Sequence, residues 1–345
     1  MATSPERENP FRLYERDLKS YKALSNYLAV VTALLALFEL LFVLRYTREI
    51  FKFKSPQLID TIVGSMALVA PLILLGFSLL LWRLMRTYGE FRSLKELFMR
   101  LRALRLRRAK EVEDGEYAMI SGEVIAASYE SPIIGKWILF SYGEIYKQRP
   151  KGKGVEDVIL RKYSLPTSIF KEGLRCRDDQ GTDFIVRLPK GDELKELMEE
   201  MEANGSSVKL QLDTVKDKEL VERIAVTPFR DVLTVKVSAF EMYDTVGVRE
   251  WYVPSDRRRI MVIGDLHRED NRITVSVKPN ESFLRFSSGG LSPVKTLEQF
   301  LRPVKAKMRR VGDRLKRELT FSILMLGLAI VTQTAYVIFL RRLAL

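Results

Sequence analysis

Three long apolar runs constrain this chain more than any other feature of its sequence. They cover residues 24–44, 58–82 and 319–340. Each run is long enough to cross a lipid bilayer as a helix, which takes about 20 residues. The stretch between the second and third runs is polar and rich in β-branched and aromatic residues. The sequence therefore predicts an α+β membrane protein with two transmembrane helices, a β-rich soluble domain and a third transmembrane helix, in that order.

Two stretches beside these runs have the pattern of basic amphipathic helices. In both, apolar residues recur at spacings of three and four with arginine and lysine between them. The sequence leaves open whether these helices lie on the membrane surface or pack together as a stalk. The expected segments are a polar N-terminus (1–23), a transmembrane hairpin (24–82), a basic helix (83–110), the β-rich domain (111–291), a second basic helix (292–318) and the third span with its tail (319–345).

The net charge of +13 arises from 57 basic and 44 acidic residues, and the excess lies beside the apolar runs. Nucleic acid could explain such a charge, but this placement favours another partner. Basic residues beside membrane spans mark the cytoplasmic side and attract anionic lipid. We therefore expect an integral protein of the cell (plasma) membrane whose N-terminus and middle domain are cytoplasmic. The expected lipid contacts are Arg100, Arg102, Arg105, Arg107, Arg108, Arg309, Arg310 and Arg314.

The first span contains one carboxylate, Glu39. An ionisable group within a span is a candidate functional group by default. The simpler interpretation places Glu39 near the far end of the span, where it reaches the headgroups and pairs with Arg45. In the third span, Thr332 and Gln333 either bond to another helix or are merely tolerated. Three spans are too few for a pore unless the chain forms a homo-oligomer.

The middle domain has a dominant period of two, which indicates strands. One stretch, DELKELMEEMEA at 192–203, predicts a short helix instead, with Asp192 near its N-cap. A small barrel or sandwich is the expected fold. The expected strands are 117–129, 136–147, 157–163, 182–188, 208–212, 232–240, 248–253, 259–266 and 271–277.

Three motifs of this domain resemble a known arrangement. ISGEVIAASYESPIIGKWILFSY (120–142) contains a strand, a Ser-Pro turn and an aromatic strand. LRCRDDQGTDFIVRLP (174–189) contains a strand, an acidic turn with glycine and another strand, and VREWYVPSDRRRIMVIGDL (248–266) contains a proline turn before a hydrophobic strand. Together they are similar to the GIDE domain, the membrane-adjacent domain of the mitochondrial RING ubiquitin ligase family. The resemblance implies a domain that lies beside a membrane and binds a partner.

The chain departs from that family in its zinc chemistry. It has one cysteine, Cys176, and one histidine, His267, whereas a RING binds two zinc ions through a set of cysteine and histidine ligands. Ubiquitin transfer through a RING is therefore excluded for this sequence. No nucleophile has an evident activating base, and Asp178 and Asp179 lie in a turn with glycine that they are expected to support. We expect no catalytic residues, no metal site and no cofactor.

Aromatic residues give two candidate surfaces for an unknown protein partner: Trp137 with Tyr142, and Trp251 with Tyr252. Core packing is the alternative role for these side chains. The leading functional hypothesis is a membrane-anchored, non-enzymatic interaction or scaffold protein. The alternatives are a RING-less component of a ubiquitin-like modification system and an accessory subunit of a membrane transporter.

Overall fold

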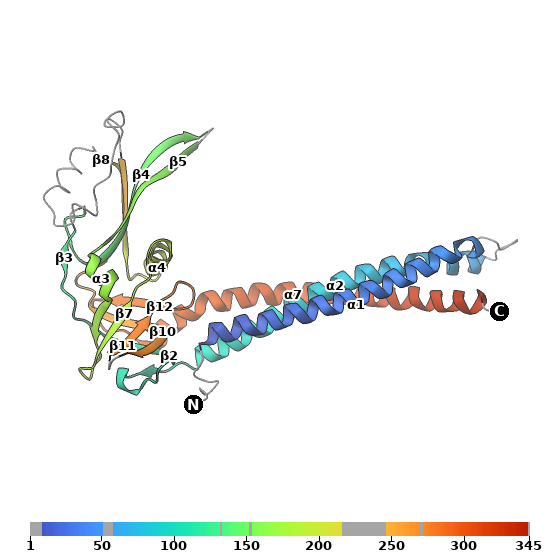
Figure 1. Cartoon of the computed structure of the whole chain (residues 1–345), viewed down its shortest axis with the longest axis horizontal. Coiled ribbons are helices and arrows are strands. Elements are labelled where there is room, and N and C mark those ends of the chain that lie inside the picture. Colours follow the sequence, from blue (N-terminus) through green and yellow to red (C-terminus); the bar gives the residue numbers. More distant parts are fainter. Residues whose placement is uncertain are drawn as a thin grey trace. The chain divides into compact units, whose positions relative to one another are not determined.

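The computed structural model of the chain describes residues 9–50, 58–131, 133–151, 154–215, 246–269 and 272–343. The chain forms two compact units. The helical unit, Pro10–Leu101 with Leu301–Leu345, contains α1 (Pro10–Ile50), α2 (Leu58–Arg102) and most of α7 (Pro293–Leu343) (Figure 1). The β-rich domain spans Arg102–Phe300. The predicted order of two long apolar helices, a β-rich domain and a third long apolar helix is confirmed.

Each long helix contains both a polar section and an apolar section without a break. In the polar sections, the ring of Phe91 on α2 lies against Gly312 of α7, where an added Cβ would be 3.2 Å from the ring. Lys307 of α7 lies over the ring of Tyr14 of α1, 5.7 Å from its centroid. The polar sections of all three helices therefore pack together.

The polar and apolar sections change over at one level of the bundle. At this level, Trp82 of α2 donates its indole N–H to Asn26 of α1 at 2.8 Å, and Arg83 of α2 pairs with Glu318 of α7 at 2.7 Å. These residues adjoin the predicted starts of the first and third spans, at residues 24 and 319. Contacts between the helices therefore bring the polar-to-apolar boundaries of α1, α2 and α7 to the same level, although these boundaries are far apart in the sequence.

In the apolar section, large apolar side chains are exposed and small or polar ones are buried, which is the reverse of a soluble helix bundle. Its most exposed side chains are large and apolar, such as Phe38 (71 % exposed), Leu79 (68 %) and Leu324 (65 %). Its buried side chains are small or polar, such as Ala36, Ser78 and Thr332. Small residues at helix contacts with large apolar residues outside are typical of helices packed in lipid. All three helices are long and apolar enough to span a membrane.

One polar contact crosses the apolar section between two helices. Gln333 of α7 donates its side-chain amide N–H to Glu39 of α1 at 2.9 Å. The interpretation in which Gln333 bonds another helix is therefore confirmed. The side chain of Arg45, the expected partner of Glu39, lies outside the part of the chain that the structure describes.

Five strands of the domain close into a barrel. They are β2 (Tyr117–Val124), β6 (Leu174–Arg177), β7 (Asp183–Arg187), β10 (Arg259–Glu269) and β11 (Arg272–Ser276). Around the barrel the order is β2-β6-β7-β11-β10, and β10 pairs again with β2. All neighbours are antiparallel except β7 and β11, which are parallel. This is the connectivity of the OB-fold, a five-stranded Greek-key barrel. Two short strands add to it, β1 (Leu106–Arg107) beside β2 and β12 (Phe283–Ser287) beside β10.

A second sheet is inserted between strands of this barrel. It consists of β3 (Tyr129–Glu130), β4 (Trp137–Lys151), β5 (Gly154–Leu165), β8 (Val208–Val215) and β9 (Val246–Pro254). Helix α4 (Asp192–Ala203) buries Leu194, Leu197, Met198 and Met201 in a core that includes residues of both sheets. The short elements α3 (Thr167–Glu172) and a 3₁₀ turn at Ala109–Glu111 complete the domain.

The structure differs from the predicted elements in four places. The predicted strand 117–129 is broken because β2 belongs to the barrel and β3 to the second sheet. The first basic helix ends at Arg102, because Leu106–Arg107 pairs with β2 as a strand. The strand Phe283–Ser287 and helix α3 were not predicted. The predicted strand 232–240 lies outside the described residues, whereas the helix at 192–203 is confirmed.

Candidate functional site

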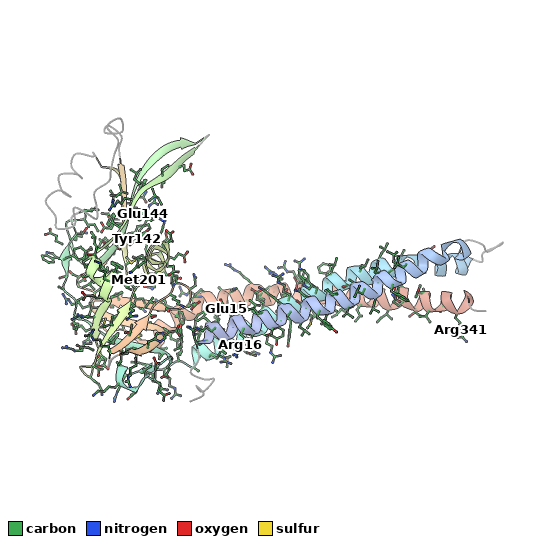
Figure 2. The ribbon with its side chains drawn as sticks, viewed as in Figure 1. Glu15, Arg16, Tyr142, Glu144, Met201 and Arg341 are labelled. Atoms are coloured by element: carbon green, nitrogen blue, oxygen red, sulfur yellow. The ribbon has the colours of Figure 1, made fainter. Side chains whose placement is uncertain are left out.

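A cluster of charged side chains lies inside the domain around Glu144 of β4, which is fully buried. Lys195 Nζ of α4 contacts Glu144 Oε1 at 3.0 Å, and Arg249 Nη1 of β9 lies 3.6 Å from Oε2. Tyr142 donates its hydroxyl to Oε1 at 3.2 Å. Figure 2 shows Tyr142 and Glu144 in the second sheet, near α4. A buried carboxylate stays charged only when such partners compensate for the loss of its hydration.

The same cluster ties together neighbouring elements. Arg249 also pairs with Asp157 of β5 at 2.7 Å. The indole N–H of Trp251 donates to Glu202 of α4 at 3.0 Å, and Lys195 and Lys209 both lie within 6 Å of its ring centroid. Burial, followed by the neighbouring Glu144 carboxylate, raises the pKa of the Tyr142 hydroxyl well above its ordinary value. The charges thus satisfy one another, so the cluster locks α4 onto the second sheet.

A second buried carboxylate, Glu250, belongs to β9 on the same sheet. Gly143 of β4 lies opposite both Tyr163 of β5 and Glu250, so the three residues form one row across the strands. A Cβ on Gly143 would be 2.1 Å from the Tyr163 ring, so the ring lies directly over this glycine. Ser131 donates its hydroxyl to Glu250 Oε1 at 3.5 Å.

Among the described residues, hydroxyl groups rather than cations act on the Glu250 carboxyl. Burial raises the pKa of Glu250 to about 7, although the hydroxyls of Ser141, Tyr163 and Ser131 act in the opposite direction. A glutamic acid in water has a pKa of about 4.3. Glu250 is therefore the one described carboxyl for which a pKa near neutrality is found, and its charge depends on pH in the physiological range.

Three of the four aromatic residues predicted as a partner surface are buried. Tyr142 is 2 % exposed, Trp251 1 % and Tyr252 5 %, so the prediction of an exposed surface is wrong for them. The physical reason is that the second sheet packs against α4, which covers the face that carries Tyr142 and Trp251. Trp137 is 60 % exposed and stays a candidate contact residue.

The remaining residues considered in the sequence have structural roles. Cys176 is fully buried, and burial raises the pKa of its thiol well above the ordinary value, which makes it unreactive. Asp178 accepts backbone N–H bonds from Thr182 and Gln180, as expected for a turn residue. His267 is half-exposed and lies 3.8 Å from Asp114. Among the described residues, no group of three His, Cys, Asp or Glu side chains could hold a metal ion.

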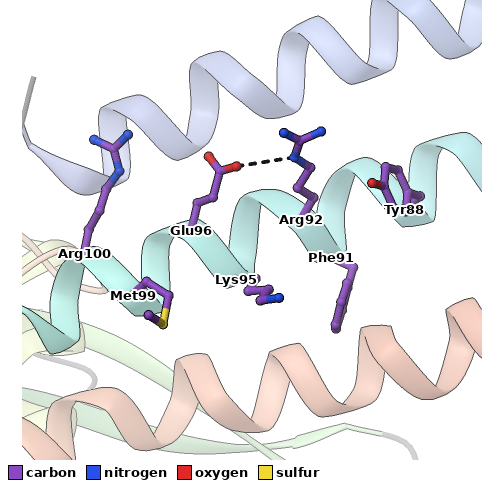
Figure 3. Close-up of a pocket in the computed structure, with 7 residues that line it drawn as sticks. All are labelled: Tyr88, Phe91, Arg92, Lys95, Glu96, Met99 and Arg100. Carbon is purple, nitrogen blue, oxygen red and sulfur yellow. Dashed lines mark hydrogen bonds and ion pairs between the residues drawn. The ribbon is translucent and has the colours of Figure 1, made fainter.

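A groove of about 500 Å³ lies on the polar section of α2. Figure 3 shows Arg92, Glu96 and Arg100 on one side of the helix and Phe91, Lys95 and Met99 on the other. Arg92 pairs with Glu96 at 3.4 Å. The groove carries basic and apolar side chains. An acidic, partly apolar ligand therefore suits it better than the same groove of a second copy of the chain. Two copies of α2 side by side in one membrane would place like charges at the same level.

The arginines predicted to contact lipid lie in different parts of the molecule. All eight are exposed, but Arg102, Arg105, Arg107 and Arg108 belong to the β-rich domain. Along the helices, Arg314 is about 8 Å from the start of the apolar section, Arg309 about 15 Å, and Arg100 about 27 Å. A headgroup layer is only about 5–8 Å thick. Of the four that lie in the helical unit, Arg314 is therefore the nearest to the apolar section.

The outer face of β6 and β7 corresponds to the ligand-binding face of OB-fold proteins. Here it carries Arg175, Arg177, Ile185 and Arg187, and Arg177 is paired with Asp183 at 2.6 Å. The aromatic residue of these strands, Phe184, is buried. Single-stranded nucleic acid is usually held by exposed aromatic rings on which bases stack. These two strands provide no exposed aromatic ring.

Comparisons with protein-family models, with characterised proteins and with solved structures gave no match. The resemblance of the three motifs to the GIDE domain therefore stays a prediction.

Proposed function

We propose that this protein is a membrane-anchored, non-enzymatic interaction module. Three helices hold the β-rich domain at the cytoplasmic face of the cell membrane, where the domain binds a protein partner. The observation that carries the proposal is the inside-out apolar section, in which Phe38, Leu79 and Leu324 are exposed and Ala36 and Ser78 are buried. Such a bundle is stable in lipid, because in water its exposed apolar side chains would favour aggregation.

The interior of the domain supports an interaction role over catalysis. Glu144, Lys195 and Arg249 satisfy one another inside the fold. The exposed Trp137, by contrast, is the kind of residue that dominates binding energy at protein interfaces. The ubiquitin-related alternative rests on the resemblance alone, and no observation in the structure favours a transporter subunit.

The proposal predicts a specific partner at Trp137 in native membranes. A photo-crosslinking amino acid at position 137 of the full-length chain is expected to give one discrete adduct. The control is the same amino acid at Ile125, which is 40 % exposed in the same domain. Mass spectrometry of both samples identifies the adducts. The proposal is contradicted if position 137 gives no protein adduct that is absent at position 125.

The level at which the three helices change from polar to apolar divides the basic residues of α7 into a pair near that level and a pair farther from it. Arg314 and Arg317 lie within about 8 Å of the apolar boundary, whereas Arg309 and Arg310 lie about 14–15 Å from it. Attraction to anionic lipid falls off over a Debye length of about 8–10 Å. Each basic residue close to the surface contributes about 1 kcal/mol. The near pair is therefore proposed to carry most of the attraction.

This difference gives a matched test on a single helix. Changing Arg314 and Arg317 together to glutamine is expected to reduce the retention of anionic lipid about tenfold or more, at about 1 kcal/mol for each residue. The matched double change at Arg309 and Arg310 is expected to have a clearly smaller effect. Native mass spectrometry of full-length protein from nanodiscs of mixed anionic and zwitterionic lipid measures the retained lipid. Equal losses of retained lipid in the two variants would contradict the proposal that distance from the apolar boundary decides lipid contact.

A further inference from the structure

The surface formed by α1 and α2 carries two basic side chains at the level where these helices change from polar to apolar. Lys22 of α1 and Arg86 of α2 are both exposed. Lys22 precedes the first apolar run by about 3 Å along the helix, and Arg86 follows the second run by about 6 Å. A headgroup layer is about 5–8 Å thick. Both side chains therefore lie at the level expected for lipid headgroups.

Two contacts fix how α1 and α2, which run in opposite directions, are aligned. At the start of the apolar section, Trp82 donates its indole N–H to the side-chain oxygen of Asn26 at 2.8 Å. Toward the polar end, Gly89 lies against Tyr21, where an added Cβ would be 2.4 Å from the tyrosine Cβ. On each helix the basic residue lies between these two contacts, so the two cations are at the same level.

Helical spacing also places the two cations on adjoining faces. Lys22 lies four residues before Asn26, and Arg86 lies four residues after Trp82, so each is one turn from the contact between the helices. The guanidinium of Arg86 lies over the Trp82 ring, 5.5 Å from its centroid. The bond to Asn26 fixes this ring. The tryptophan therefore holds the guanidinium in place through a cation–π contact.

Neither cation is neutralised within the described part of the chain. Lys22 and Arg86 form no ion pair with a described carboxylate. By contrast, the neighbouring Arg83 pairs with Glu318 of α7 at 2.7 Å. The indole N–H occupies the side-chain oxygen of Asn26, which leaves its amide nitrogen as a further donor. Two cations and an amide donor close together suit the oxygen atoms of a phosphate group.

Exposed apolar side chains continue the same two faces into the apolar section. On α1, Val30 and Leu34 follow Asn26 in steps of four residues, and on α2, Leu79 precedes Trp82 by three. All three apolar side chains are more than half exposed. They offer a surface to acyl chains directly below the cations. A free phosphate ion would use the cations alone, whereas a phospholipid would use both parts of this surface.

We propose that Lys22, Arg86 and Asn26 bind the phosphate group of an anionic phospholipid in the cytoplasmic leaflet, with its acyl chains along α1 and α2. An anionic headgroup is preferred because a zwitterionic headgroup brings its own cation beside the phosphate. The inference rests on the proposed membrane anchoring. It adds a lipid site on α1 and α2 to the basic pair Arg314 and Arg317 of α7.

Quenching of Trp82 fluorescence by brominated lipid tests the site in full-length protein in bilayers. Brominated anionic lipid is mixed with unlabelled zwitterionic lipid, and brominated zwitterionic lipid gives the reference. A Trp82→Phe variant in each background supplies the signal of the other tryptophans for subtraction. Together these measurements give the preference for anionic lipid at Trp82. Changing Lys22 and Arg86 together to glutamine is expected to lower this preference about tenfold or more.

The matched control changes Arg16 and Lys95 to glutamine. This pair also removes one arginine and one lysine, one from each helix, but it lies about 12 Å and about 20 Å from the apolar runs. The preference is expected to stay nearly unchanged, because attraction falls off over about 8–10 Å. The proposal is overturned if both double variants lose the preference equally, or if the parent protein shows none. Failure of the chain to enter the bilayer would instead contradict the proposed anchoring, and the site with it.

Inorganic phosphate distinguishes a lipid headgroup from a free anion as the ligand. An excess of phosphate at constant ionic strength is expected to leave the quenching by anionic lipid unchanged, because the acyl chains hold the lipid against α1 and α2. Loss of that quenching would show that the cations take a free phosphate ion, and it would overturn the assignment of a phospholipid to this site.

Discussion

Changing Glu144 to glutamine is expected to lower the free energy of unfolding of the β-rich domain by about 3–5 kcal/mol, the usual effect of removing one partner from a buried ion pair. Glu144 is fully buried and is the carboxylate that Lys195 and Arg249 share. Arg249 keeps Asp157 as a partner, but Lys195 loses its ion-pair partner while it stays partly buried. The amide cannot replace the missing negative charge.

This effect can be measured by hydrogen exchange of the β4 and β9 amides in full-length protein in nanodiscs. The matched control is Asp183→Asn, which removes the exposed ion pair with Arg177 and is expected to cost less than about 1 kcal/mol. Adding Lys195→Met to Glu144→Gln is expected to recover part of the loss, because it removes the uncompensated cation. Equal effects of Glu144→Gln and Asp183→Asn would show that the buried cluster does not hold the domain together.

Glu250 is expected to make the stability of the domain fall as pH rises from about 4 to about 7. Its pKa is about 7 in the folded domain and about 4.3 in an unfolded chain. Below pH 4 both states are protonated, so Glu250 has no effect on the balance. Between these two pKa values the unfolded state ionises first, and above pH 7 the folded state must hold a buried charge. The resulting loss, complete above pH 7, is about 4 kcal/mol.

Glu250→Gln tests this expectation, because glutamine has a similar shape and does not ionise. At pH 8 the variant is expected to be more stable than the parent protein by up to about 4 kcal/mol, less any cost of the altered bond to Ser131. At pH 4.5, close to the pKa of the unfolded chain, the advantage is expected to fall to about 0.5 kcal/mol. Hydrogen exchange of the same amides, corrected for the intrinsic pH dependence of exchange, gives both values. A difference between the two proteins that is independent of pH would contradict a raised pKa at Glu250.

Several features of the fold could be predicted because their signals are local. The apolar runs lie within α1, α2 and α7, and the apolar residues of α4 recur at helical spacing between Asp192 and Ala203. Strand β7 alternates between buried and exposed residues, and β10 contains a run of four apolar residues. Local signals fail where an element changes partners. The run from Tyr117 to Tyr129 reads as one strand in the sequence, yet the chain passes from the barrel to the second sheet within it.

The buried carboxylates were missed, although the sequence contains a signal for them. Glu144 and Glu250 each lie within strands whose other residues are mainly apolar and aromatic, and Gly143 directly precedes Glu144. A carboxylate inside such a strand requires a partner, and that partner cannot be found from the strand alone. Lys195 and Tyr163 reach these carboxylates only through tertiary packing.

The sequence by itself determined that the chain has three membrane-length helices, that a β-rich domain lies between the second and third, and that basic residues adjoin the spans. These properties follow from hydrophobic periodicity and charge over short windows. Tertiary structure alone decided that the polar helix sections pack together, that five strands close into a barrel, and that Tyr142, Trp251 and Tyr252 are buried. Each of these features depends on contacts between residues that are far apart in the sequence. Strand pairing, close packing at Gly312 and the burial of charge together select those contacts.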